Sequence, residues 1–282
     1  MLDFRYHALS LVAVFLALGI GIVLGATIGD SVVSQANKDV RSSLRGDLLD
    51  ALSRARTSAT ELTRRDRFDT AAFPYIAGDR LRGKRVALVS SGPLPQDVEN
   101  SARNAVKDGG GTVDSLSQLD ARPDPVALAK GLGGNARPPA GAAPPVRPLA
   151  RKLGKQLVRG GRVPRKLQTA LPDSFKGDYR GADAVIYYRT NDNRDNQSKT
   201  FESSLIEGLR SSGVPVVGVE RSQTDPSQIR NYVNAGLTTV DDIDIPPGRI
   251  ALVLTLVGAT GDFGFKQTAE APLPPPTAVP GP

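Results

Sequence analysis

The sequence predicts a mixed α/β protein in which a transmembrane helix and a helical stalk precede a three-layer domain. Three observations predict this class. An uncharged apolar run lies near the N-terminus, apolar residues then recur at helical spacing, and short apolar runs finally alternate with helical stretches. The chain has 282 residues with 29 Gly and 22 Pro, a share that indicates some unstructured stretches within a folded protein.

The first 29 residues are predicted to be a membrane anchor. Residues 8–28 form 21 consecutive uncharged positions, enough to cross a hydrocarbon core of about 30 Å. A cleaved signal peptide is the alternative, but its apolar region has only about 7–15 residues, and no Ala-x-Ala site follows. We therefore expect an uncleaved single span.

Small residues at every fourth position predict a helix-pairing face inside this span. Such a stripe lets two membrane helices approach closely, although glycine is also common in membrane helices generally. The positive charges that flank the span do not decide its orientation in the membrane. Arg5 precedes the span, and Lys38, Arg41 and Arg45 follow it. The pairing face comprises Ala13, Ala17, Gly21, Gly25 and Gly29.

Residues 30–69 are predicted to form a coiled-coil stalk. The apolar positions follow an eleven-residue period, about 3.67 residues per turn, which favours nearly straight paired helices. We expect a parallel homodimer; the alternative is one amphipathic helix folded onto the domain. The seam comprises Val40, Leu44, Leu48, Ala51, Ala55, Ala59 and Leu62.

Residues 75–268 are predicted to form the domain. Its strands alternate with helices, which favours a mostly parallel sheet and a Rossmann-like three-layer fold. The expected strands cover residues 85–89, 184–188 and 214–219 and begin again at 112, and the expected helices cover 96–107, 198–210, 226–234 and 249–258.

Two Pro/Gly-rich stretches, 120–148 and 269–282, are predicted to be a mobile insertion and a disordered tail. The basicity of the chain is concentrated between Arg137 and Arg180, which contains eleven Lys or Arg and two acids. This segment is either a binding surface for phosphate-bearing polymers, lipid headgroups or an acidic partner, or a solvated loop. The basic surface comprises Arg151, Lys152, Lys155, Arg159, Arg162, Arg165 and Lys166.

The residues indicate no catalytic, cofactor-binding or metal site. There is no Cys, and His7 is the only histidine, so the domain has no Ser–His or Cys–His pair. No nucleotide-binding glycine motif follows a strand, and a ligand would have to bind in the loops after Val89 and Tyr188. The carboxylates of Asp192 and Asp195, like Asp241, Asp242 and Asp244, are interpreted as capping and turn residues. No nucleic acid is expected as a partner.

Three segments resemble the actinobacterial copper transporter MctB family, whose corynebacterial relative is known as SteB. They are RYHALSLVAVFLALGIGIVLG at the N-terminus, GVPVVGVERSQTDPSQI, and GLTTVDDIDIPPGRIALVLTLVGATGDFG. The resemblance implies a cell-membrane protein of the envelope with an extracytoplasmic domain. It also implies a role in copper homeostasis or transport, or a dimeric scaffold that acts with a SteA-like membrane partner on a peptidoglycan hydrolase. No catalytic motif carries over.

Of these roles, the residues favour a non-enzymatic dimeric scaffold. A pore needs several helices or a closed barrel, and this sequence provides one apolar helix. The alternatives are a SteB-like regulator of cell separation and a ligand-binding α/β module on a stalk. An enzyme that uses Asp192 and Asp195 is the least favoured.

Overall fold

The computed structural model describes residues 4–133, 145–170, 173–190 and 195–279, without the side chains of residues 4–5, 26–39 and 170. The chain divides into two units, Met1–Arg65 and Asp66–Pro282. Each unit is described by itself below.

The first element is one continuous helix, α1, from Phe4 to Ile76. Within it, Tyr6–Gly25 has a mean hydropathy of 2.6 and is long and apolar enough to cross a bilayer. This confirms the single apolar helix expected near the N-terminus. Pro74 lies in the last turn, where its missing N–H helps to end the helix.

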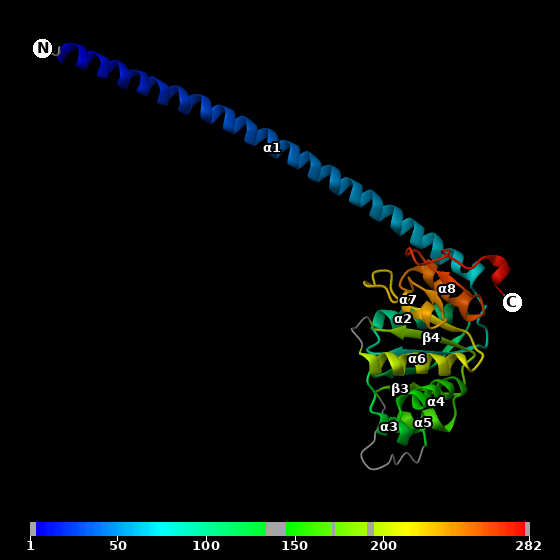
Figure 1. The fold of residues 1–282 in the computed structure, drawn as a ribbon. Coiled ribbons are helices and arrows are strands. Elements are labelled where there is room, and N and C mark those ends of the chain that lie inside the picture. Colours follow the sequence, from blue (N-terminus) through cyan, green and yellow to red (C-terminus); the bar gives the residue numbers. More distant parts are fainter. Residues whose placement is uncertain (1–3, 134–144, 171–172, 191–194, 280–282) are drawn as a thin grey trace. The chain divides into compact units, whose positions relative to one another are not determined.

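The domain is built on a seven-stranded sheet with strand order β3-β2-β1-β4-β5-β6-β7. In Figure 1, β4 of this sheet lies between helices α2 (Gln96–Asp108) and α6 (Asn196–Arg210). Only the β2–β3 pair is antiparallel, which confirms the mostly parallel sheet. The strands are β1 Arg85–Ser91, β2 Thr112–Leu119, β3 Phe175–Gly177, β4 Ala184–Arg189, β5 Val216–Val219, β6 Thr238–Val240 and β7 Asp262–Phe263.

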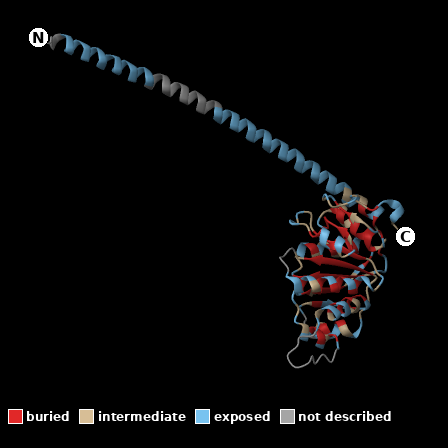
Figure 2. Ribbon diagram, in the orientation of Figure 1, coloured by how far each residue is buried: buried red, intermediate tan, exposed pale blue. Residues whose placement is uncertain are grey.

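Helices cover both faces of this sheet. The side chains of β1 alternate between two hydrophobic cores, Val86 and Leu88 in one and Ala87 and Val89 in the other. The first core is completed by α2 and α8, and the second by α3 to α7, so the three-layer arrangement is confirmed (Figure 2). The helices are α2 Gln96–Asp108, α3 Pro125–Gly131, α4 Val146–Arg159, α5 Arg162–Ala170, α6 Asn196–Arg210, α7 Ile229–Asn234, α8 Pro246–Leu256 and the 3-10 helix η1 Pro276–Ala278.

The insertion at 120–148 differs from the expectation because it contains a packed helix. Helix α3 begins after Asp124, whose side chain accepts a hydrogen bond from Val126 N at 2.9 Å. Leu128 and Ala129 are buried in the second core. An N-cap Asp followed by Pro is a helix-start signal that the Pro/Gly-rich composition obscured. Residues 134–144 of the insertion lie outside the described residues.

The tail also begins with packed residues, where disorder was expected from residue 269. Gly264 N donates to Ala271 O at 3.0 Å, and Ala271 forms an isolated bridge with Phe263 in β7. Ala271 and Leu273 pack against the first core. Apolar residues between the prolines therefore hold the first part of the tail on the domain, and residues 280–282 lie outside the described part.

Helices α4 and α6 cross at two glycines. A Cβ on Gly154 would collide with Leu205 O, and a Cβ on Gly208 would collide with Arg151 O. Both positions therefore need glycine so that the two backbones can touch. This close crossing fixes the outer surfaces of α4 and α6 side by side.

Candidate functional site

The loops after β1 and β4 are where a ligand would have to bind, at the carboxyl edge of the sheet. Ser90 and Ser91 at the end of β1 are fully buried, and Ser90 Oγ donates to Gly92 O at 2.7 Å. Thr190 Oγ1, directly after β4, donates to Pro93 O at 2.9 Å. The two loops are thus joined to each other by a hydrogen bond across the expected binding crevice.

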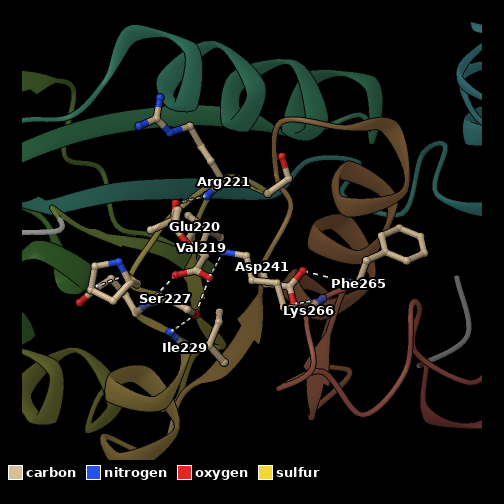
Figure 3. Close-up of polar contacts among 12 residues, drawn as sticks. Val219, Glu220, Arg221, Ser227, Ile229, Asp241, Phe265 and Lys266 are labelled. Atoms are coloured by element: carbon tan, nitrogen blue, oxygen red, sulfur yellow. Dashed lines mark hydrogen bonds and ion pairs between the residues drawn. The ribbon is translucent and has the colours of Figure 1, made fainter. Parts of the chain in front are cut away.

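A buried carboxylate, Glu220, directly follows β5 at the same edge (Figure 3). Glu220 is 0% exposed to solvent. The carboxylate accepts hydrogen bonds from Ser227 Oγ at 2.7 Å and Gln228 N at 2.6 Å, and it forms an ion pair with Lys266 Nζ at 2.5 Å. One buried charge is therefore compensated by a cation and by two neutral donors.

A second carboxylate, Asp241, occupies the equivalent position after β6. It accepts hydrogen bonds from Phe265 N and Lys266 N, both at 3.0 Å (Figure 3). Gly264 precedes these donors with φ of +138°, and a Cβ there would collide with the Asp241 carboxylate. Burial raises the pKa of Asp241, while the two backbone donors and Lys266 oppose that rise. Asp241 holds the loop that brings Lys266 to Glu220.

The contacts continue to β4 through Gln228. The Arg189 guanidinium donates to Gln228 Oε1 and lies 3.1 Å from Glu202 Oε2 on α6. Tyr232 OH accepts from Arg189 N at 2.9 Å and donates to Val219 O at 3.1 Å. We call the set Glu202, Arg189, Gln228, Glu220, Lys266 and Asp241 the polar network; it links α6, the ends of three strands and the loop after β7.

The polar network holds loops in place, because its carboxylates are engaged by donors of the chain itself. Glu220 and Asp241 each accept at least two hydrogen bonds, so their lone pairs are directed inward. Among the described residues, no group of three or more His, Cys, Asp or Glu could hold a metal ion.

Asp242 is the exception to this compensation. Asp242 is buried, with 1% of its surface exposed. Neither of its carboxyl oxygens has a hydrogen-bond partner among the described residues. Burial raises its pKa from 3.8 to about 7, and the nearby Asp241 and Asp244 charges add to the rise. Asp244 itself accepts from Ser222 N and Oγ, both at 2.7 Å. Asp242 is therefore a buried group that gains or loses a proton near neutral pH.

The acidic residues singled out in the sequence do not gather into one site. Asp195 accepts from Ser198 N at 2.8 Å as the N-cap of α6, which confirms its interpretation as a capping residue. It also lies 3.0 Å from Arg122 in an ion pair. Asp192 lies outside the described residues. Asp241, Asp242 and Asp244 lie in the turn that precedes α8, as interpreted from the sequence, and Asp241 and Asp242 are buried there.

The predicted pairing positions on α1 are exposed wherever their side chains are described. This holds for Ala13, Ala17, Gly21 and Gly25, whereas Gly29 lies among the residues without described side chains. Along the stalk seam, Leu44 is 62%, Leu48 58% and Leu62 59% exposed. Val40, Ala51, Ala55 and Ala59 are exposed as well. Pairing through either face stays a prediction.

The predicted basic surface separates into two parts. Arg151, Lys152 and Lys155 line a cavity between α4 and α6. The other members, which are exposed, lie at the end of α4 and on α5, and these are Arg159, Arg162, Arg165 and Lys166.

Sequence reasoning missed the members of the polar network other than Asp241. Glu220 carried a usable signal, because it directly follows the apolar run 214–219 and so ends a buried strand. Lys266 and Gln228 carried none, since their role depends on which strands are neighbours.

The chain matches the model of the family described as "Copper transport outer membrane protein, MctB" over residues 1–142 and 174–274. The proteins named copper transporter MctB from Mycobacterium bovis and Mycobacterium tuberculosis are 26% identical over 311 aligned residues, covering 95% of this chain and 98% of theirs. The matched segments include all of α1 and the polar network. The chain therefore belongs to the MctB family of copper transport outer membrane proteins.

Proposed function

We propose that this chain is a non-enzymatic, single-pass envelope protein that contributes to copper homeostasis or transport as a parallel dimeric scaffold, with its domain outside the cytoplasm. Family membership supports the link to copper. The observation that carries the scaffold is the exposed apolar seam of α1, where Leu44 and Leu48 lie one helical turn apart. Burying each leucine in a partner helix would contribute about 1.5–3 kcal/mol.

We expect the double substitution Leu44→Asp plus Leu48→Asp to convert a dimer into a monomer. Four carboxylates would face one another across the paired seam, where charges are desolvated. The mass of the full chain in detergent, measured by light scattering with correction for bound detergent, reports this change.

The matched control is Gly46→Asp plus Ser53→Asp, which adds the same charge on the opposite side of α1. This variant should remain a dimer. A wild-type chain that is already monomeric, or equal dissociation of both variants, would contradict a dimer built on this seam.

A scaffold of this kind should not carry copper on its own side chains. The chain has no Cys, one His and one Met, the residue types that bind Cu(I) best. We expect less than one Cu(I) per protomer to be retained against a chromophoric Cu(I) chelator. Retention of one or more ions against micromolar competition would show that the chain is itself a copper carrier.

The second candidate is a SteB-like regulator of cell-wall hydrolysis that acts through a SteA-like partner. Two features favour it. The carboxylates of Glu220 and Asp241 accept hydrogen bonds from donors of the chain itself, and a groove between paired stalk helices would accept an amphipathic partner helix. Complementation of a deletion strain distinguishes the candidates. If the strain that carries Leu44→Asp plus Leu48→Asp is sensitive to copper but its cells separate normally, the copper role is favoured. If its cells remain joined in chains while copper tolerance is normal, the cell-separation role is favoured.

A further inference from the structure

A basic cavity of about 700 Å³ opens between α4 and α6. It shares no residue with the polar network, and its volume falls in the range of about 300–1,000 Å³ typical of small-molecule sites. Its walls are formed by Arg147, Pro148, Arg151, Lys152 and Lys155 from α4 and by Ser203, Ser204 and Glu207 from α6.

Positive charge in this cavity exceeds the negative charge that could balance it. Arg151 forms an ion pair with Glu207, and Lys152 Nζ donates to Leu132 O at 3.0 Å. Neither Arg147 nor Lys155 has a hydrogen bond or ion pair with any residue in the described ranges. Two cations without a counter-charge among the described residues therefore line one cavity, and a bound anion would be attracted to both.

The spacing of the cations indicates the size of this anion. Arg147, Arg151 and Lys155 follow at every fourth position, so they form one stripe along the outer face of α4. The stripe is about 12 Å long at about 1.5 Å per residue. A single phosphate would reach only part of it, whereas each further phosphoryl group in a ligand would extend the contact along the row.

The chemistry of the walls suits phosphoryl oxygens. The Arg151 guanidinium is held by Glu207 through one of its nitrogens and keeps further N–H donors, and guanidinium groups bind phosphate through two parallel hydrogen bonds. Ser203 Oγ and Ser204 Oγ donate to Thr200 O at 3.2 and 2.8 Å. The longer of these bonds is exposed, so rotation of Ser203 can redirect its hydroxyl to a ligand.

The cavity is formed before any ligand binds. Gly154 and Gly208 hold the two helices in backbone contact beside it. On the opposite face of α4, Leu153 and Leu157 are buried in the second core. Because the helix backbones are already fixed, binding does not require the two helices to rearrange.

We propose that this cavity binds an anion with two or more phosphoryl groups. Helices α4 and α5 lie between the two segments that match the family model, so the inference comes from this chain's own residues. The site is independent of the dimeric stalk and of copper.

The test is titration of the full chain, held in phosphatidylcholine nanodiscs, with tripolyphosphate in a calorimeter at two salt concentrations. We expect saturable binding that weakens with salt, and affinity at least about tenfold higher than for inorganic phosphate. Arg147→Gln plus Lys155→Gln should weaken binding by at least about tenfold, because two charge-assisted contacts to phosphoryl oxygens are lost. Neither side chain has a hydrogen bond or ion pair with a described residue, so this variant should fold normally.

The matched control is Arg162→Gln plus Arg165→Gln on α5, which removes the same charge from exposed positions outside the cavity. It should bind tripolyphosphate within about twofold of the wild type, as expected for screened distant charges. Equal weakening in both variants would reduce the effect to net charge and overturn the site. Absence of saturable binding by the folded wild type would overturn it as well.

The phosphoryl groups could belong to an anionic lipid headgroup or to a soluble compound, and competition with vesicles distinguishes these two sources. Cardiolipin vesicles, whose headgroup carries two phosphates, are added to the chain with bound tripolyphosphate, and phosphatidylcholine vesicles serve as the reference. Displacement by cardiolipin alone assigns the cavity to a lipid headgroup. Retention of tripolyphosphate against both vesicles assigns it to a soluble or polymeric phosphate.

Discussion

Replacing Lys266 by Met is expected to lower the free energy of unfolding of the domain by about 3 kcal/mol. Lys266 Nζ is the cation that compensates Glu220, which is fully buried. Its removal leaves a carboxylate in the interior with two neutral donors, so the charge must be desolvated without a counterion or be protonated. Urea unfolding of the full chain in detergent, followed by tyrosine fluorescence, measures the loss.

The double variant Glu220→Gln plus Lys266→Met is expected to recover most of this stability, because it removes the buried charge together with its partner. Lys199→Met serves as the control for loss of a lysine, since Lys199 is exposed on α6 and should have an effect within about 0.5 kcal/mol. If Lys266→Met is as mild as Lys199→Met, the ion pair does not contribute to stability.

The second large effect is a dependence of stability on pH that comes from Asp242. Its pKa is 3.8 in the ordinary environment and about 7 in the fold, so the folded state retains a proton that the unfolded state has lost between these values. The free energy of unfolding should therefore fall as the pH rises from about 4 to 7, by up to about 4 kcal/mol, and level off above. Urea midpoints across this range, measured at constant ionic strength, provide the curve.

Asp242→Asn should remove most of this slope and stabilise the domain at pH 8, because the amide is never ionised. Asp241 also has a raised pKa and will leave a smaller slope of the same sign in the variant. Asp108→Asn, at an exposed position on α2, should retain the full slope of the wild type. Parallel curves for the wild type and Asp242→Asn would show that Asp242 is not the group that titrates.

The layered fold was predictable because its strongest signals are local. Four consecutive apolar residues, Val86 to Val89, can be buried only if both faces of their strand are covered, and this alone predicts a central parallel strand. In contrast, α4 was hidden within a basic stretch. Its buried positions Ala150, Leu153 and Leu157 do follow helical spacing, but the intervening charges and the flanking prolines masked it.

The polar network could not be predicted by the same reasoning. Arg189, Glu220 and Lys266 come from segments far apart in the sequence, and they are brought into one network because β4, β5, β6 and β7 are successive neighbours in the sheet. That order depends on how the helices between them cross over, which residue patterns do not encode. The basic cavity was anticipated as a charged segment, but its concave shape depends on the glycine crossing of α4 and α6.

The two outermost strands of the sheet limit how copies of the domain can assemble. Strand β3 has three residues, including Lys176, and β7 has two. Strand β3 is short and carries a lysine, and the margin of β7 is already bonded to the tail at Ala271, so both margins offer a poor template for strand addition from another chain. The domain is thereby protected against edge-to-edge aggregation and amyloid-like growth. Copies of the chain would then associate through the surfaces of helices. Such association can be reversible and limited to a defined number of chains.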